Sequence, residues 1–418
     1  MSIALELSAA AVSAAADRLR TIARRTPLER SDRLSEDLAT SVWLKREDLQ
    51  IGRSYKVRGA YNLISSLSPE ERGRGVVCAS AGNHAQGVAF SCRALGISGK
   101  VFLPSATPRQ KRERILAVGR PWVDLVVDGA NYDEASAAAL ESSAASGSVL
   151  VHPFDDPRTI AGQGTVAIDL DEQCAERFGT VVVPVGGGGL VAGMAIWLKE
   201  HRPDVRLVGA EPAGAASMAA ALAADRPVSL PAVDTFVDGA AVGTVGELTY
   251  PVVRDLVDAV VSVPEGAVCT EMLSLYQVEG IIAEPAGALA SAAARRLPQD
   301  WTEGPIVCVV SGGNNDVSRY SDIVERSLVH EGLKHYFLVT FPQQPGALRR
   351  FLDSVLGADD DITLFEYVKK SNRETGPALV GIELARASDL EGLLTRMEAS
   401  PLQIDRVPPG SPLFTFLV

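Results

Sequence analysis

Short apolar runs alternate with helix-compatible stretches along most of this 418-residue chain, and the alternation restricts the folds it can adopt. Runs of β-branched and other apolar residues predict strands, which we expect at residues 42–45, 76–79, 100–103, 124–127, 149–152, 180–185, 206–210, 259–263 and 306–310. Helices are expected between them, including 85–95, 109–118, 133–146, 164–178 and 190–201. Strands that alternate with helices form mostly parallel sheets covered by helices, so the pattern predicts an α/β fold.

The pattern changes after Asn315, which indicates a second domain. A connecting helix is expected first, and then a compact series of strand 335–341, helix 346–356, strands 362–369 and 378–384, helix 388–399, strand 403–407 and a last strand near 413–417. The βαββαβ order is typical of a ferredoxin-like α+β domain. We therefore predict an enzyme body at 1–325, a connector at 326–333 and a module at 334–418 in which no catalytic cluster is evident.

Composition limits the partners and the compartment of the chain. The formal net charge is -12 and the pI is about 5.1, so nucleic acid, which calls for basic patches, is not expected as a partner. The five cysteines are read as reduced thiols, and the five histidines are too dispersed for a metal cluster. The first residues lack the basic start of a signal peptide, and no run approaches the ~20 apolar residues of a membrane span. These features predict a cytoplasmic protein.

A glycine-rich turn separates the strand expected at 180–185 from the helix after it, and it consists of Gly186, Gly187, Gly188 and Gly189, with Leu190 next. Such a turn lets backbone N–H groups converge on a phosphate at the positive end of the helix. Four adjacent glycines lose much conformational entropy on folding, so a plain flexible turn is the weaker alternative. No Gly-Lys-Ser/Thr follows, which excludes a P-loop.

A dinucleotide-binding loop is the main rival interpretation of this turn. Gly187, Gly189 and Ala192 fit the pattern G-x-G-x-x-A, and Glu211 ends the next expected strand, about where a ribose-binding acid would stand. The chain would then be a nicotinamide-dependent dehydrogenase. Such an enzyme would not need the lysine and serine motifs found elsewhere in the sequence.

Lys56 lies in a run of aromatic, β-branched and small residues, Ser-Tyr-Lys-Val-Arg-Gly-Ala at 54–60. The small residues indicate a crowded site and the apolar neighbours a partly desolvated one, which favours a neutral, nucleophilic amine. Taken alone, a solvated surface lysine is the more frequent case.

Two further turns follow expected strands. Ser311 comes directly after the strand at 306–310, so its hydroxyl would stand at the carboxyl end of a parallel strand, where α/β proteins bind ligands. After the strand at 76–79, a turn enters a helix whose amide-rich start suits a carboxylate, with Ser80, Ala81, Gly82, Asn83 and His84. A strand-ending turn and an ordinary capped helix are the corresponding structural alternatives.

Together these motifs resemble the fold-type-II pyridoxal phosphate enzymes, and in particular their threonine dehydratase branch. The resemblance covers about residues 20–325 and rests on six motifs in matching order: Lys-Arg-Glu-Asp-Leu-Gln at 45–50, the lysine motif at 54–60, Ser-Ala-Gly-Asn-His-Ala-Gln-Gly at 80–87, the glycine turn at 186–189, Glu-Pro-Ala-Gly-Ala at 284–288 and Ser-Gly-Gly-Asn at 311–314. The chain departs from the family at Tyr55, where phenylalanine is common, and at 237–242. Neither departure changes the expected chemistry.

The resemblance implies a tryptophan synthase β-like body of two α/β subdomains, with pyridoxal 5'-phosphate in the cleft between them. It implies that Lys56 is the catalytic amine that holds the cofactor and removes the Cα proton. It assigns the phosphate to Gly186, Gly187, Gly188, Gly189 and Leu190, the ring hydroxyl to Asn83, the pyridine nitrogen to Ser311, and the substrate carboxylate to Ser80, Ala81, Gly82 and His84. Glu284 is a candidate wall residue of the site or a purely structural one.

The C-terminal module contains Phe-Pro-Gln-Gln-Pro-Gly-Ala-Leu at 341–348 and resembles the ACT-like regulatory domain of biosynthetic threonine dehydratases, in a single copy. The resemblance implies an L-threonine ammonia-lyase that eliminates water from L-threonine and yields 2-oxobutanoate and ammonia at the entry to isoleucine synthesis. Isoleucine is the expected inhibitor, valine a second candidate effector, and a homotetramer the expected assembly. Either the cofactor phosphate or Lys56 would protonate the leaving hydroxyl. A serine dehydratase, a serine racemase and a non-catalytic amino-acid sensor are further alternatives, beside the dehydrogenase.

Overall fold

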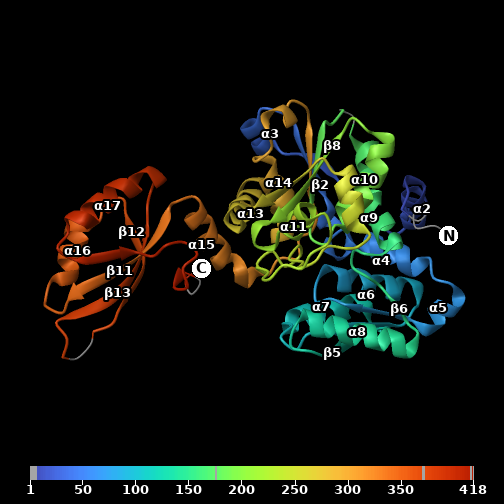
Figure 1. Ribbon diagram of the computed structural model, residues 1–418, viewed down its shortest axis with the longest axis horizontal. Helices are drawn as coiled ribbons and strands as arrows, with labels where there is room; N and C mark the ends of the chain where they lie inside the picture. The colour runs from blue at the N-terminus through green and yellow to red at the C-terminus, as the bar shows by residue number, and fades with distance from the viewer. Residues whose placement is uncertain (1–6, 175–176, 370–371, 415–416, 418) are drawn as a thin grey trace. The chain divides into compact units, whose positions relative to one another are not determined.

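The computed structural model describes residues 7–174, 177–369, 372–414 and 417, and the chain divides into two compact units, Met1–Asp316 and Val317–Val418 (Figure 1). The first unit contains two sheets built mainly of parallel strands and covered by helices, which confirms the predicted α/β fold. The second contains one antiparallel sheet. The sequence-based boundaries at 325 and 333 stay predictions, and the structural division falls ahead of the connecting helix.

The larger sheet of the first unit is parallel except where β1 pairs with β2. Its strands, in spatial order, are β1 (Leu28–Arg30), β2 (Val42–Arg46), β10 (Ile306–Val310), β7 (Thr180–Pro184), β8 (Arg206–Pro212) and β9 (Ala259–Val263). Strands β7 and β10 are buried along their whole length, because their valines and isoleucine pack on both faces of the sheet. Their carboxyl ends lead directly into the glycine turn and into Ser311.

Helices cover this sheet, and one of them differs from its prediction. Helix α10 (Gly189–His201) packs on α9 (Pro157–Gln173), while α14 (Pro285–Ala294) packs on β7 and β10. Helix α9 begins well before the start predicted at 164. The Asp156 carboxylate accepts a hydrogen bond from the Arg158 backbone N–H at 2.8 Å, and proline suits the first helical position.

The smaller sheet of the first unit is entirely parallel. Its strands, in spatial order, are β5 (Val123–Val127), β4 (Gly99–Leu103), β3 (Val76–Ala79) and β6 (Val149–Leu150). Helices α6 (Asn83–Leu95), α7 (Arg109–Gly119) and α8 (Tyr132–Ser146) pack around it. Strand β6 is shorter than the predicted 149–152, since Pro153 has no N–H to extend the ladder.

Helix α4 (Lys56–Ser65) links the two sheets of the first unit, because it contacts α6 on one side and α9 on the other. Close approach to α9 depends on Gly59, where an added Cβ would lie 2.8 Å from the Thr159 carbonyl oxygen. The buried Arg58 guanidinium pairs with Glu47 at 2.8 Å and with Asp169 at 2.6 Å. These contacts fix the end of α4 at which Lys56 lies.

The second unit has the βαββαβ order that the sequence predicts. After α15 (Tyr320–His330) it comprises β11 (Lys334–Pro342), α16 (Ala347–Val355), β12 (Asp361–Tyr367), β13 (Thr375–Glu383), α17 (Leu390–Ala399) and β14 (Gln403–Arg406), with the sheet order β12-β13-β11-β14. The prediction of a last strand near 413–417 is wrong for the residues of that range that the structure describes. Phe414 and Leu417 belong to a turn closed by an N–H···O bond of 2.9 Å, and residues 415–416 lie outside the described ranges.

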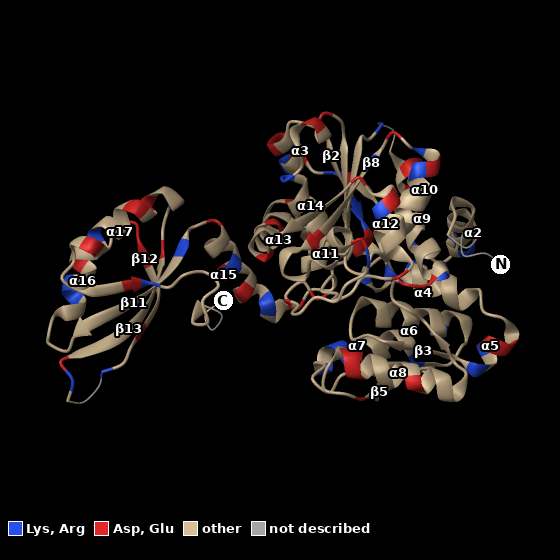
Figure 2. Ribbon diagram, in the orientation of Figure 1, with Lys and Arg blue, Asp and Glu red and all other residues tan. Residues whose placement is uncertain are grey.

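Acidic and basic residues lie side by side on outer helices such as α5 (Pro69–Arg74), α7 and α16 (Figure 2). Several form ion pairs one helical turn apart, for example Arg74 with Glu70 and Arg109 with Glu113. Within the described ranges, no helix is long and apolar enough to cross a membrane. The same residues contain no group of three or more His, Cys, Asp or Glu side chains that could hold a metal ion.

Candidate active site

Three helices of the first unit begin at residues that the sequence assigns to the site. Helix α4 begins at Lys56, α6 at Asn83 and α10 at Gly189. The N-terminal N–H groups of a helix lack acceptors within the helix and form its positive end. These helix starts therefore suit a ligand with negatively charged groups.

The glycine turn has no room for side chains. An added Cβ on Gly187 would overlap the Phe154 ring, and one on Gly188 would lie 2.8 Å from the Thr249 hydroxyl oxygen. Gly188 also has a φ of +93°, which favours glycine. The Thr249 hydroxyl donates to the Gly187 carbonyl oxygen at 2.6 Å and holds the turn from outside. The turn before α10 is thus bare backbone, and its role as a phosphate cradle stays a prediction.

Lys56 lies beside this turn. Its Nζ donates to the Pro153 carbonyl oxygen at 3.1 Å, and the next residue, Phe154, is the one that packs on the glycine turn. The side chain is half-buried, with Nζ 5.2 Å from the centre of the Tyr55 ring. No local pattern in the sequence marks Pro153 or Phe154, because the contact between Pro153 and Lys56 spans 97 residues of chain and Phe154 meets the distant glycine turn.

Ser311 is adjacent to the same lysine segment. Its carbonyl oxygen accepts the Tyr55 backbone N–H at 3.2 Å, and its buried hydroxyl donates to the Ala286 carbonyl oxygen at 3.2 Å. The end of β10 therefore meets the start of α4. The structure brings Ser311 and Lys56 together although 255 residues separate them in the sequence numbering.

Asn83 is held by two side chains. Its Nδ2 donates to Glu284 Oε1 at 2.6 Å, and its Oδ1 accepts from Asn314 Nδ2 at 2.7 Å. Glu284 is 5% exposed, and burial, reinforced by the charge of Asp238, raises the pKa of its carboxyl to about 7. Asn314 is a site residue that sequence reasoning missed. Its only signal is its place in the Ser-Gly-Gly-Asn motif.

His84 is a neutral side chain at the start of α6. Burial, and then the positive charge of Lys56, lowers the pKa of its imidazole to about 3. Nε2 lies 2.7 Å from the Val151 carbonyl oxygen, so it is the protonated nitrogen, and buried Nδ1 has no partner among the described residues. Ser80 shapes the preceding turn, because its hydroxyl oxygen accepts the Gly82 N–H at 3.2 Å. Ala81 lies in that turn and Leu190 is buried in the first turn of α10.

Glu211 does not have the role that the dinucleotide interpretation requires. It is 1% exposed, and its carboxylate accepts the backbone N–H groups of Met218 and Ala219 at 3.0 Å each. Those residues begin α11 (Ser217–Ala224). Glu211 is thus a buried helix cap, and it is not exposed to bind a ribose.

Two known family profiles match the chain. The profile of the "Pyridoxal-phosphate dependent enzyme" family matches residues 3–312. The profile "C-terminal regulatory domain of Threonine dehydratase" matches residues 325–417. The two matches correspond to the two kinds of domain that the sequence predicts.

One named relative matches nearly the whole chain, and two solved structures match about three quarters of it. The chain is 58% identical over 415 residues to a Mycobacterium bovis protein named "L-threonine dehydratase biosynthetic IlvA", covering 99% of this chain and 96% of that protein. Among solved structures, threonine deaminase isoform 2 from Solanum lycopersicum is 39% identical with a TM-score of 0.72, over 76% of this chain and 92% of that one. Maize serine racemase is 33% identical with a TM-score of 0.71, over 77% of this chain and 98% of that one.

Proposed function

The chain belongs to the biosynthetic threonine dehydratases, a family of pyridoxal-phosphate-dependent enzymes, and we propose that it converts L-threonine to 2-oxobutanoate and ammonia in the cytoplasm, as the first step of isoleucine synthesis. The observation that supports this most directly is the match to a biosynthetic dehydratase over both units. The likeness to serine racemase covers only 77% of the chain. A racemase or a plain serine dehydratase would leave the C-terminal regulatory domain without a role.

The residues of the site fit pyridoxal phosphate. The cofactor needs an amine, a phosphate cradle and a partner for its pyridine nitrogen. An added Cβ would press on packed neighbours at each position of the turn, since the nearest atoms to a Cβ on Gly186 or Gly189 lie about 3 Å away, so the turn keeps its backbone bare. We propose that Lys56 holds the cofactor covalently, Asn83 donates to its ring oxygen, and Ser311 faces its nitrogen. The N–H groups of Gly186, Gly187, Gly188, Gly189 and Leu190 would bind its phosphate.

Bound pyridoxal phosphate supplies an acceptor for the electrons released when the Cα–H bond of the substrate breaks. Ser311 would set how strong that acceptor is, because its neutral hydroxyl, turned from the Ala286 carbonyl oxygen, would hydrogen-bond the pyridine nitrogen without keeping it protonated. Prompt loss of the β-hydroxyl is then favoured over long-lived negative charge at Cα. This matches elimination rather than racemisation.

Lys56 and the start of α6 divide the remaining tasks. The freed Lys56 amine removes the Cα proton, and its ammonium form is one candidate acid for the leaving hydroxyl. The turn of Ser80, Ala81 and Gly82 leads into the positive end of α6, where the substrate carboxylate would bind. His84 is uncharged at neutral pH, so at this turn the backbone dipoles provide the attraction.

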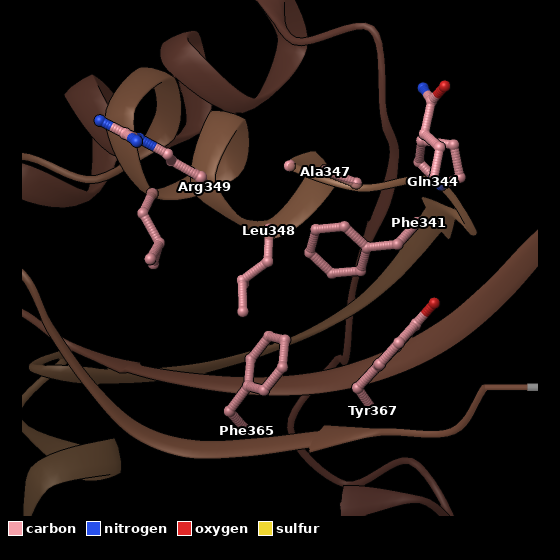
Figure 3. A pocket seen from close by; sticks show the side chains of 10 residues that line it. Phe341, Gln344, Ala347, Leu348, Arg349, Phe365 and Tyr367 are labelled. Atoms are coloured by element: carbon pink, nitrogen blue, oxygen red, sulfur yellow. The ribbon is translucent and has the colours of Figure 1, made fainter.

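The second unit contains a pocket suited to a small aliphatic effector. Its volume is about 440 Å³, and it lies between α16 and the strands β11 and β12. Figure 3 shows Phe341, Leu348, Phe365 and Tyr367 gathered around it. We propose that the side chain of isoleucine binds among these residues, with its carboxylate at the start of α16, which follows Gly346. Valine, which is one methylene smaller, would bind about fourfold more weakly.

Exposed apolar side chains that line this pocket, together with Val368 beside it, support self-association. Leu348, Leu352, Tyr367 and Val368 are each 38–54% exposed on α16 and on or beside the edge strand β12. We propose that they are covered when copies of the chain assemble into a symmetric homotetramer. Light scattering of the purified protein measures the assembly directly.

One assay tests the proposed function. The purified full-length protein, supplied with pyridoxal phosphate, is incubated with L-threonine or L-serine, with and without isoleucine, and the 2-oxo acid is measured. We expect 2-oxobutanoate from threonine at the higher rate and inhibition by isoleucine. Formation of D-serine without 2-oxo acid would make the protein a racemase, and the absence of both products would refute the proposal.

A further inference from the structure

Four groups form a hydrogen-bonded chain beside the candidate active site. The Gly52 carbonyl oxygen accepts from Asn314 Nδ2 at 2.6 Å, and the same Nδ2 donates to Asn83 Oδ1 at 2.7 Å. Asn83 Nδ2 then donates to Glu284 Oε1 at 2.6 Å. Glu284 Oε2 closes the group by accepting the Asn314 backbone N–H at 3.2 Å.

The Gly52 end of this chain fixes the orientation of both amides. A backbone carbonyl oxygen only accepts, so the Asn314 atom that faces both Gly52 and Asn83 must be its Nδ2. Asn83 therefore turns its Oδ1 towards Asn314 and its NH₂ group towards Glu284. One hydrogen of the Asn83 NH₂ group is used by Glu284, and the other remains for a further acceptor.

The fold makes room for the Glu284 carboxylate at this place. Glu284 occupies the N-cap position of α14, yet its side chain makes no capping hydrogen bond to that helix. An added Cβ on Gly312 would overlap its Oε1, and one on Gly239 would lie 3.4 Å from it. A buried carboxylate is costly to desolvate, and here burial and Asp238 both oppose its charge. The side chain is thus held where it costs free energy, and there it accepts the hydrogen bond from Asn83.

We propose that Glu284 is a positioning residue, which orients the Asn83 amide so that it presents an N–H donor to the ring oxygen of bound pyridoxal phosphate. The proposal rests on the proposed function, since it assumes that this cofactor is the ligand. Glu284 acts through Asn83 and does not itself take part in the reaction. A purely structural Glu284 would stabilise the fold without affecting the cofactor.

Glu284→Gln tests this with little change in size. A glutamine has one acceptor and one donor end, so either Asn83 Nδ2 or the Asn314 N–H must face another donor. We expect the dissociation constant for pyridoxal phosphate to rise about tenfold or more, with a shift of the visible absorption maximum of the bound cofactor. Glu211→Gln is the matched control, because Glu211 is an equally buried carboxylate with two backbone donors, and it should leave both readouts unchanged.

A double-mutant cycle separates positioning from stability. If Glu284 acts through Asn83, the double variant Glu284→Gln/Asn83→Ala should bind the cofactor no more weakly than Asn83→Ala alone. Additive losses would overturn the proposal, as would a wild-type affinity and spectrum for Glu284→Gln. If Glu284→Gln does not fold, Asn314→Ala breaks the chain from its other end and should produce the same spectral shift, whose absence also overturns it. A wild-type protein that binds no pyridoxal phosphate would refute the proposed function instead.

Discussion

The two units bury different kinds of side chain. Within the described residues, the first unit buries charged groups, among them Lys45, Glu47, Asp48, Arg58, Glu211 and Glu284. The second has a core of aromatic and aliphatic residues, and the polar residues buried in its described part are Ser327, Lys334 and His335. Chemistry on an amino acid requires polar groups held in fixed orientations, whereas recognition of an aliphatic effector requires an apolar pocket. The difference indicates that catalysis and control are built into separate units.

The variant with the largest expected effect on this separation of catalysis from control removes the amine of the first unit. Lys56→Ala should lower the rate of threonine deamination by at least about 10³-fold, because no other lysine in the described part of the chain is placed to hold the cofactor or move the Cα proton. Isoleucine binding, measured by calorimetry, should persist. Lys100→Ala, which changes an exposed lysine on β4, should remain active. A Lys56→Ala enzyme that still deaminates threonine would refute the assignment.

A second test uses the buried carboxylates of the first unit. Burial raises the pKa of Glu211 from its ordinary value of 4.5 to about 7, so the folded state binds this proton more tightly than the unfolded state. Stability from this group is therefore present below pH 4.5 and is lost as pH rises to about 7, by ~3 kcal/mol. Urea unfolding at several pH values should show this loss in the wild type and a smaller one in Glu211→Gln. Equal pH dependence in both proteins would show that Glu211 is not the group responsible.

The glycine turn offers a test of intermediate size. Gly188→Asp adds bulk against Met218 and Thr249, together with a negative charge at the phosphate cradle. We expect the dissociation constant for pyridoxal phosphate to rise about 30-fold, equivalent to ~2 kcal/mol, in equilibrium dialysis. Gly280→Asp is the control, since Gly280 also has a positive φ, of 66°, but no described atom would lie within 4 Å of its Cβ. If Gly188→Asp retains pyridoxal phosphate as well as the control does, the turn does not bind the cofactor phosphate.

A variant in the pocket of the second unit should affect control and leave catalysis unchanged, and its expected effect is the smallest of the four. Phe365→Ala removes an aromatic wall, and we expect isoleucine to bind about tenfold more weakly while threonine deamination without isoleucine stays unchanged. Leu338→Ala, at an exposed apolar residue of β11 outside the pocket, should leave the isoleucine affinity as it is. Unaltered inhibition of Phe365→Ala would place the effector elsewhere.

Local pattern makes much of this molecule predictable. Alternating runs indicate the α/β architecture and the βαββαβ order, and the four glycines mark a turn whose packing leaves no room for a Cβ. Apolar spacing alone does not predict the early start of α9. That start is determined by polar and proline residues, with Asp156 as the N-cap and Pro157 as the first helical residue. The last predicted strand fails because an apolar run alone cannot distinguish a strand from a turn.

The contacts that build the site are beyond prediction from local pattern. Asn83 and Glu284 are 201 residues apart, and Asn83 and Asn314 are 231 apart. Their hydrogen bonds depend on how two sheets and three turns come together. The sequence therefore indicates Asn83 by resemblance, while the orientation of its amide is evident only from the folded chain.

The central claim is that catalysis resides in the first unit and feedback control in the second. The most direct measurement compares the full-length protein with a chain ending at Asp316, both supplied with pyridoxal phosphate, by titrating isoleucine into the threonine deamination assay. We expect isoleucine to lower the threonine deamination activity of the full-length enzyme about 5- to 150-fold, which is the usual range of allosteric coupling. The shortened chain should deaminate threonine at a rate that isoleucine does not change. A shortened chain that isoleucine still inhibits, or one that is inactive and aggregated, would contradict the separation of the two functions.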